Sequence, residues 1–271
     1  MKNLLVHLCN SSRTKIAIES AVELASLSKS KIRGVSILDT RQLTQKTALE
    51  TSAYAGVEAV RLTLSRRRQQ QACNEFVEAC RRRNVPYEID DVQGDPLELL
   101  VEEAKYSDLT IVSFRKHMHR HESGLSVQDL VELAQRSIQP LLVLRKPPSQ
   151  LTRVLLIYDG SSSASRAIKT FMACASYLGK QFRLLCVGDA ANPEGDAFRA
   201  MSQYCRSRID SLEVGCLPGS PSRTAAKYAT KWEADLLVLG ISRPSTWLGI
   251  PFSHFGSGIL RRTNYSVFAI S

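Results

Sequence analysis

The sequence predicts an α/β protein made of two tandem domains, each an open parallel sheet with helices on both faces. The sequence indicates a duplicated domain, since the segment at 4–12 is matched 150 positions later by the segment at 154–162. Within each half, apolar strand-length segments alternate with helical ones, and parallel strands need such crossovers. The segment Lys146-Pro147-Pro148-Ser149-Gln150 is the expected linker, since prolines stiffen it. We therefore expect domains at 1–146 and 151–271.

The shared order of landmarks supports duplication along the whole chain. The offset of 150 also relates Ile18 to Ile168 and Asp39 to Asp189. Further landmarks keep the same order: Gly94-Asp95-Pro96 and Gly219-Ser220-Pro221, Ser107-Asp108-Leu109 and Ala234-Asp235-Leu236, and the closing strands Leu141–Leu144 and Val267–Ile270.

Each element of the first repeat has its own signal. Leu4 to Leu8 is apolar throughout, as in a buried strand, and Ser11-Ser12 can cap a helix whose apolar residues share one face. Pro96 marks another helix start, which Leu97, Leu100, Val101 and Ala104 continue on one face. The remaining elements are expected as strands at 31–38, 85–89, 109–113 and 141–144, a long helix at about 53–83, and a helix around 130–135.

Composition describes an ordinary globular protein. Apolar residues make up 44% of the chain and charged residues 23%, and no apolar run approaches the roughly 20 residues of a membrane helix. We expect a cytoplasmic protein without a membrane span. The seven cysteines form no C-x-x-C pair, so reduced and mostly buried thiols are expected. The net charge of +10 indicates only a general attraction to anions.

A phosphate cradle is expected at the strand ends of the second repeat. Ligands of open parallel sheets bind beyond the carboxyl ends of the strands, where the winding reverses. There the chain has Asp159-Gly160-Ser161-Ser162-Ser163, Gly240-Ile241-Ser242-Arg243 and Gly256-Ser257-Gly258. Glycines admit phosphate close to backbone N–H groups, and helix starts and serine hydroxyls add donors.

These residues resemble the universal stress protein family, in its tandem two-domain form, across nearly the whole chain. The resemblance rests on Asp159-Gly160-Ser161 and on Asp235-Leu236-Leu237-Val238-Leu239-Gly240. It implies Rossmann-like domains of the adenine-nucleotide alpha hydrolase type, related by a pseudo-two-fold axis, with the final strands of the two repeats paired. It also implies ATP as the ligand: Asp159 and Val187 would face the base, and Gly240, Gly256, Ser257 and Gly258 would surround the ribose and phosphates.

The second repeat departs from the family pattern in one loop. Arg243 stands where the family has a second glycine, and twelve residues instead of nine separate it from Gly256-Ser257. Arg243 either pairs with phosphate oxygens or fills the pocket, and both interpretations stay open. The apolar segment Trp247-Leu248-Gly249-Ile250-Pro251-Phe252 is compatible with a lid, an interface or plain packing.

The first repeat has lost the ligand pattern. Cys9-Asn10 replaces Asp159-Gly160, Ser113-Phe114 replaces Gly240-Ile241, and Leu130-Val131 replaces Gly256-Ser257. Larger side chains in place of glycines are expected to block phosphate, so this half is interpreted as scaffold.

Two further strings have ordinary explanations. His117, His119 and His121 could ligate a metal from an extended segment, but a solvated loop is favoured, and no metal requirement is predicted. The triplets Arg66-Arg67-Arg68 and Arg81-Arg82-Arg83 are interpreted as a solvated helix face, so nucleic acid is not expected as a partner.

No nucleophile–base pair emerges, so we expect a non-enzymatic stress-response or regulatory protein. Any adenine nucleotide is expected in the C-terminal domain alone, and a protein partner or further oligomerisation is compatible with the sequence. The alternatives are a nucleotide-hydrolysing enzyme, and a partner- or anion-binding scaffold without nucleotide.

Overall fold

The computed structural model describes the chain in two compact units, Met1–Leu130 and Val131–Ser271. The described residues are 1–9, 14–41, 52–113, 125–188, 192, 195–242, 246–247, 250–251, 258–259 and 265–271. The strand of the first repeat that precedes the expected linker lies in the second unit, because it pairs there. The expected linker itself contains a 3₁₀ turn, η1 (Pro148–Gln150).

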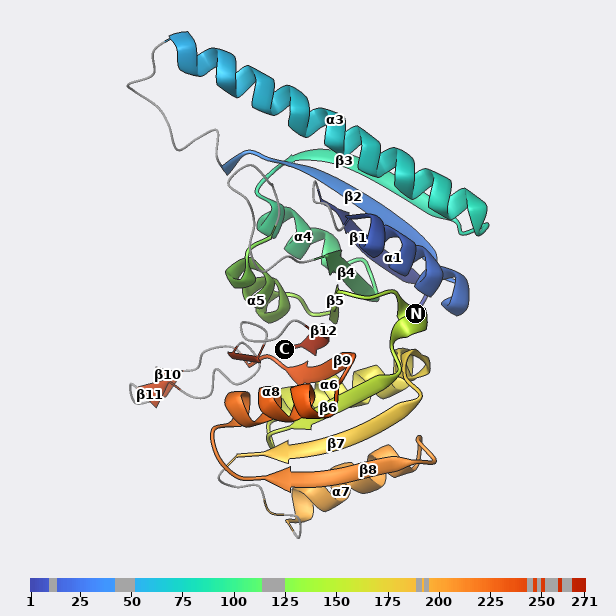
Figure 1. Ribbon diagram of the computed structural model, residues 1–271, viewed down its shortest axis with the longest axis vertical. Helices are drawn as coiled ribbons and strands as arrows, with labels where there is room; N and C mark the ends of the chain where they lie inside the picture. Colours follow the sequence, from blue (N-terminus) through green and yellow to red (C-terminus); the bar gives the residue numbers. More distant parts are fainter. Residues whose placement is uncertain are drawn as a thin grey trace. The chain divides into compact units, whose positions relative to one another are not determined.

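The first unit has four neighbouring parallel strands (Figure 1). Its strands are β1 (Asn3–Leu8), β2 (Lys31–Asp39), β3 (Tyr87–Gly94) and β4 (Leu109–Ser113), in the order β3-β2-β1-β4. Its helices are α1 (Thr14–Ser28), α3 (Ser52–Arg82), α4 (Pro96–Ala104) and the start of α5 (Val127–Arg136). The expected α/β alternation is therefore confirmed.

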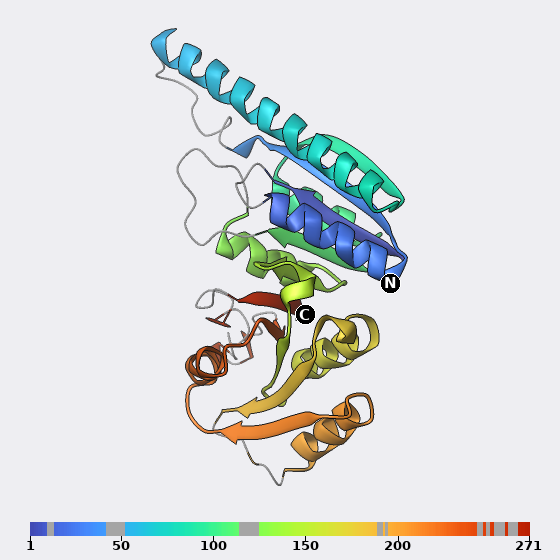
Figure 2. The same cartoon turned by 45° about the vertical axis from the view of Figure 1, so that its right-hand side comes forward.

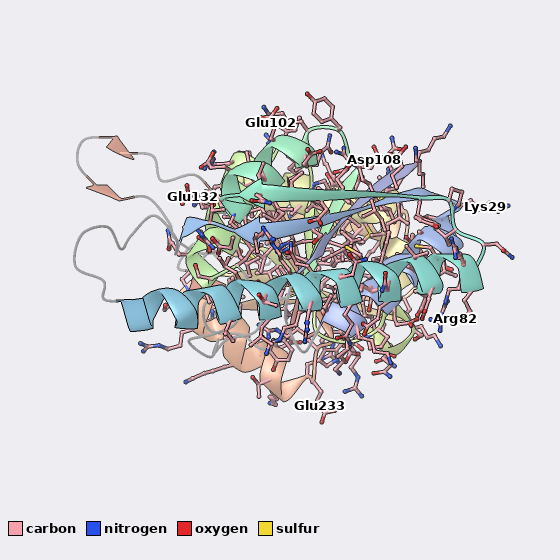
Figure 3. The ribbon with its side chains drawn as sticks, turned by 90° about the horizontal axis from the view of Figure 1, so that it is seen from above. Lys29, Arg82, Glu102, Asp108, Glu132 and Glu233 are labelled. Carbon is pink, nitrogen blue, oxygen red and sulfur yellow. The ribbon has the colours of Figure 1, made fainter. Side chains whose placement is uncertain are left out.

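Helices cover both faces of these four strands. A Cβ at Gly34 of β2 would lie 2.9 Å from the ring of Phe76 on α3, whereas the next residue back, Arg33, pairs with Glu103 on α4. Successive strand residues point to opposite faces, so α3 and α4 lie on opposite sides of β2. Helix α1 packs against α3. Lys29 directly follows α1, and Arg82 is the last residue of α3. Figure 3 shows both residues at the same end of the unit.

The strand expected at 85–89 begins later than predicted. Asn84 has a positive φ of 51°, and the Val85 N–H donates to the carbonyl of Cys80, which closes α3 in a Schellman motif with Val85 buried. Apolar Val85 therefore belongs to the helix end. β3 itself is an edge strand whose charged residues protect it from pairing with another chain.

The second unit has six neighbouring strands. Their order is β5-β12-β9-β6-β7-β8, and the β5–β12 pair is antiparallel. Figure 2 shows α6 and α7 on one side of these strands and α8 on the other. The strands are β5 (Leu141–Leu144), β6 (Arg153–Tyr158), β7 (Gln181–Val187), β8 (Leu212–Leu217), β9 (Leu236–Gly240) and β12 (Ser266–Ile270). The other elements are α6 (Ser162–Cys174), η2 (Ser176–Leu178), α7 (Asp196–Arg206), α8 (Pro221–Lys231) and the small pair β10 (Thr246–Trp247) and β11 (Ile250–Pro251).

Strand register confirms the duplication residue by residue. Asn3 of β1 pairs with Lys31 of β2, and Arg153 of β6 pairs with Gln181 of β7, which is the same register displaced by 150 positions. The expected pairing of the two closing strands is also confirmed, since Phe268 of β12 lies opposite Leu142 of β5. Phe268 is fully buried and stacks edge-on against Phe171 of α6, with ring centroids 5.3 Å apart.

The cysteine prediction is confirmed as well. None of the seven cysteines, all of which lie in the described ranges, forms a disulfide, and five of them are buried. Cys186 and Cys216 are register partners on β7 and β8. Burial raises the pKa of the Cys186 thiol to about 11, so this cysteine is a neutral thiol near neutral pH.

Candidate functional site

The candidate site lies at the C-terminal ends of β6, β7 and β9. These strands are adjacent in the order β9-β6-β7, and the winding reverses between β6 and β9. Asp159 follows β6, Val187 ends β7 and Gly240 ends β9. The fold thus brings these three predicted site residues to one edge of the sheet, where open parallel sheets bind ligands.

The turn after β6 is held by its own side chains. The Asp159 carboxylate accepts a hydrogen bond of 3.0 Å from the Ser161 N–H, and Gly160 between them has a φ of +81°. Ser161 then caps α6, because its hydroxyl accepts a hydrogen bond of 3.1 Å from the Ala164 N–H. Asp159-Gly160-Ser161 therefore has a structural role that does not depend on a ligand.

A chain of three serine hydroxyls connects this turn to the segment that follows β9. Ser161 Oγ lies 3.0 Å from Ser163 Oγ, which lies 2.9 Å from Ser242 Oγ. Ser163 is buried, and the Ser242 carbonyl accepts a hydrogen bond of 3.1 Å from the Gln135 amide. The sequence placed Ser242 in the expected cradle but gave no sign of its contact with Ser163, since only the fold places it beside the start of α6.

Gly240 is required by packing. A Cβ at this position would lie 2.3 Å from the backbone nitrogen of Ala164 and 2.3 Å from the carbonyl carbon of Ser163. No side chain fits between β9 and the first turn of α6. Packing alone therefore explains a glycine at this position, without a phosphate ligand. Gly258 is less restricted: its Cβ would lie 3.1 Å from Ser222 Cβ, in the first turn of α8.

Several predicted residues lie outside the described part of the chain. They are Arg243, Gly256 and Ser257, together with the three histidines of the candidate metal string, His117, His119 and His121. Among the described residues, no three His, Cys, Asp or Glu side chains come together as a metal site requires. No helix in the described ranges has both the length and the apolar character for a membrane crossing.

The corresponding edge of the first unit holds an arginine among three carboxylates. The Arg41 guanidinium lies 2.7 Å from Asp39, which follows the buried part of β2, and 3.3 Å from Asp129 in the first turn of α5. Asp95, the N-cap of α4, lies 4.0 Å from it. The Asp39 hydrogen bond raises the pKa of Arg41, which stays charged. Sequence reasoning missed this cluster, because its members are far apart in the chain.

His7 lies near this cluster, next to the last residue of β1. Its side chain is 2% exposed, and burial lowers the pKa of the imidazole to about 4, with Asp39 opposing and Arg41 reinforcing the shift. His7 is therefore neutral at physiological pH. The second unit has Ile157 at the equivalent register position, so the histidine is not required by the fold.

Comparison with known proteins gives structural matches only. No family model and no curated protein sequence matches the chain. A universal stress protein from Archaeoglobus fulgidus DSM 4304 superposes with a TM-score of 0.74 at 15% identity, covering 99% of this chain and 96% of that one. A protein from Pseudomonas aeruginosa UCBPP-PA14, named as a candidate universal stress protein, has a TM-score of 0.66 at 12% identity, covering 100% and 93%. Since both matches span both repeats, the chain has the fold of the universal stress proteins in its tandem, two-domain form.

Proposed function

We propose that the protein is a non-enzymatic regulatory protein of the universal stress type that binds an adenine nucleotide in its second unit alone. The observation that carries this proposal is the contrast between the two equivalent edges. In the second unit the edge offers serine hydroxyls and glycines, and in the first unit it holds the ion pair of Arg41 and Asp39.

The second-unit edge is suited to a phosphate group. The start of the 13-residue helix α6 supplies the positive end of a helix dipole, and Ser161, Ser163 and Ser242 supply hydroxyl donors. A Cβ at Gly160 would meet no atom within 4 Å, so there is open space beside this turn. Gly188, directly after β7, also has a positive φ, of 127°.

The proposed roles follow the position of each residue. Asp159 and Val187 contact the base, because they lie at the ends of the adjacent strands β6 and β7. The serines, with Gly258 and the sequence neighbours Gly256 and Ser257, surround the ribose and phosphates. Arg243 lies next to Ser242 in the chain and reaches the phosphates if it is not folded into the pocket.

The first unit is proposed to bind no nucleotide. Its Arg41 is already neutralised by Asp39 and Asp129, whose side chains are 4% and 16% exposed. A phosphate would have to displace these carboxylates and leave them near a new negative charge. This costs more than binding at an edge that has free donors.

A binding role is favoured over hydrolysis because, among the described residues, the hydroxyls of these serines form no hydrogen bond with a histidine or a carboxylate. The hydroxyl of Ser163 is paired with those of Ser161 and Ser242, and neither pairing supplies a histidine or carboxylate that could remove its proton. A nucleotide-hydrolysing enzyme remains the alternative class, and product formation separates the two.

Calorimetric titration of the full chain with ATP tests the proposal. We expect at most one site per chain and no sustained release of phosphate. Asp159→Asn keeps the turn, because an amide oxygen still accepts from Ser161 N–H, and is expected to weaken binding about tenfold through the base. Asp210→Asn, at an exposed position of the same unit, is the matched control. Two equivalent sites, or steady turnover, would overturn the proposal, and mass spectrometry of molecules released on denaturation identifies any retained nucleotide.

A further inference from the structure

A second pocket of the second unit lies beside α8, away from the edge described above. It has a volume of about 570 Å³, within the range of roughly 300–1,000 Å³ that is usual for small-molecule sites. None of its lining residues belongs to the candidate nucleotide site. It is lined by Arg183, Leu217, Thr224, Lys227, Tyr228, Lys231 and Trp232.

Arg183 is held in place by aromatic side chains. Its guanidinium carbon lies 4.7 Å from the centroid of the Trp232 ring, and one of its nitrogens donates a hydrogen bond of 3.2 Å to the Tyr228 hydroxyl. Arg183 also pairs with Glu213 on β8, whose side chain is 66% exposed. The floor of the pocket is thus ordered, and the carboxylate that pairs with Arg183 lies outside the lining.

The pocket carries an excess of positive charge. Lys227 and Lys231 are four residues apart on α8, so they lie on the same face of the helix, and both are exposed. Within the described ranges, neither lysine forms an ion pair. With Arg183 the lining contains three cations and no acidic side chain, and Leu217, Tyr228 and Trp232 supply apolar surface.

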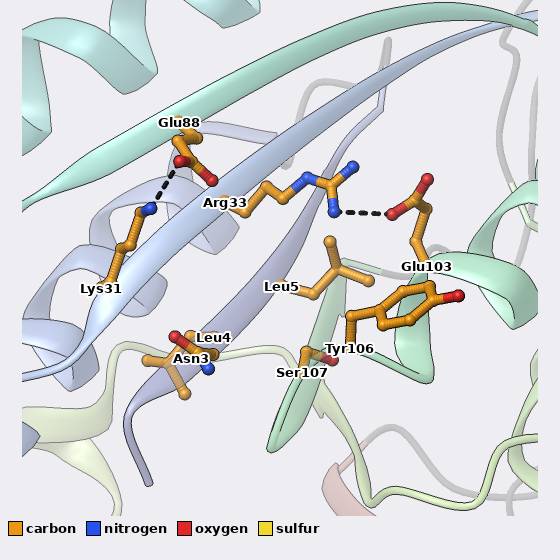
Figure 4. A pocket seen from close by; sticks show the side chains of 9 residues that line it. All are labelled: Asn3, Leu4, Leu5, Lys31, Arg33, Glu88, Glu103, Tyr106 and Ser107. Carbon is orange, nitrogen blue, oxygen red and sulfur yellow. Dashed lines mark hydrogen bonds and ion pairs between the residues drawn. The ribbon is translucent and has the colours of Figure 1, made fainter.

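The first unit shows that the fold does not demand this charge. Arg33 faces Glu88 across β2 and β3 in the same register in which Arg183 faces Glu213 across β7 and β8. A pocket beside Arg33 in that unit measures only about 190 Å³. Figure 4 shows its cations paired with carboxylates from within the lining, Lys31 with Glu88 and Arg33 with Glu103 at 2.8 Å.

From this contrast we propose that the α8 pocket, defined by its seven lining residues, binds a small organic anion with a flat apolar body. The anionic group lies between Lys227 and Lys231, where two cations are available without a competing carboxylate. The apolar body packs against Leu217 and the aromatic side chains. A carboxylate, a sulfonate or a phosphate can serve as the anionic group. The ligand is therefore an aromatic acid or a mononucleotide.

Binding of 8-anilinonaphthalene-1-sulfonate to the full chain tests the proposal, because this probe is a flat apolar anion. We expect saturable binding at one site, detected by probe fluorescence and by calorimetry. The double variant Lys227→Gln/Lys231→Gln should weaken it about tenfold or more. The double variant Arg206→Gln/Arg223→Gln removes the same charge from exposed helix positions outside the lining and should change affinity less than about twofold.

Two further measurements make the test specific. Leu217→Glu places a carboxylate in the pocket and should abolish binding, while the uncharged analogue N-phenyl-1-naphthylamine should bind wild type and the lysine variant alike. Equal weakening in both double variants, unchanged affinity in the lysine variant, or absence of a saturable site would overturn the proposal. Far-ultraviolet circular dichroism and thermal unfolding verify that each variant is folded.

Displacement of the probe identifies the source of the anion. Adenosine monophosphate represents mononucleotides and indole-3-acetate represents aromatic acids, and the one that displaces the probe at lower concentration is the class that the pocket selects. The measurement is repeated in Asp159→Asn, whose unchanged displacement would separate this pocket from the proposed nucleotide site. Displacement by neither compound would overturn the assignment to a biological anion of this kind.

Discussion

Asp108 and Asp235 occupy equivalent positions in the two units and make the same contacts. The Asp108 carboxylate accepts hydrogen bonds from the backbone N–H groups of Lys2 and Asn3, at 2.5 and 3.0 Å, and Asp235 accepts from Thr152 and Arg153, both at 3.0 Å. Each aspartate thereby joins the start of its own strand to the start of the neighbouring strand. These contacts help to lower the pKa of both carboxylates.

Replacement of Asp235 by alanine is expected to destabilise the second unit by about 1.5–3 kcal/mol, the usual contribution of hydrogen bonds to a charged group. Asp235→Asn keeps an acceptor for the two N–H groups but turns an amide toward Lys146, which now pairs with Asp235 Oδ1 at 2.6 Å. Asp108→Asn is the matched control, because both strand N–H groups donate to one oxygen of Asp108 and no lysine of the described ranges pairs with the other. Urea unfolding should rank Asp235→Ala below Asp235→Asn, and Asp108→Asn closest to wild type.

His7→Ile is expected to remove part of the loss of stability in acid. Because the folded pKa of His7 is about 4, the unfolded chain binds a proton between about pH 6.5 and pH 4 that the folded chain does not. Stability therefore falls as the pH decreases through this window, by roughly 3 kcal/mol in total, and is unaffected by His7 above it. Urea midpoints at about pH 4.5 and pH 7 should differ less in the variant. An equal difference in both proteins would show that His7 is protonated when folded.

Gly240→Ala and Gly160→Ala should differ strongly in cost. An added Cβ at Gly240 meets backbone atoms of α6 at 2.3 Å, so we expect a loss of about 3 kcal/mol or more. At Gly160 the space is open, and only the positive φ opposes alanine, at roughly 1 kcal/mol. Thermal unfolding measures both, and similar values would contradict the close approach of β9 and α6.

Arg243 separates two versions of the nucleotide proposal. If its guanidinium contacts phosphates, Arg243→Ala should weaken ATP binding by about 1.5–3 kcal/mol. If the side chain fills the pocket, Arg243→Ala should strengthen binding, and Arg243→Gly should do so further because it restores backbone freedom. Titrations of the three proteins at one salt concentration decide, and tight wild-type binding lost in both variants would exclude the blocked pocket.

A fragment that starts at residue 131 should associate less than one that starts at residue 151. The longer fragment keeps β5, which covers the edge of β12, whereas the shorter one leaves that edge bare and prone to pair with another chain. We expect less association from 131–271 than from 151–271, measured by light scattering, because only the shorter fragment exposes β12. A single substitution such as Phe268→Asp is a poorer test, because Phe268 also packs against Phe171 in the core of the unit.

Most of the fold could be predicted because each repeat carries its own local signals. Periodic apolar segments located β1, β4 and β5, and proline located the start of α4, where Asp95 accepts from Leu97 N–H at 2.8 Å. The start of β3 was missed, because a polar edge strand lacks the apolar run that marks a buried one.

The sequence could predict at which edge of the sheet the site lies, but not the contacts within the site. Strand order places Asp159, Val187 and Gly240 together, and the glycine-rich pattern indicates a ligand there. The requirement for Gly240 comes from its distance to α6, and the Arg41 cluster joins residues from three elements. Such contacts depend on tertiary packing, which no short sequence pattern encodes.

The antiparallel pair of β5 and β12 imposes an order of events on synthesis. Roughly 120 residues separate Leu144 from Val267, and at about 5–20 residues per second the ribosome needs roughly 6 to 25 s to make them. Throughout this interval β5 is present without β12, although it is entirely apolar and buried in the finished protein. The nascent chain must shield Leu141–Leu144 during that time, so this strand is the segment where a chaperone is expected to act during translation.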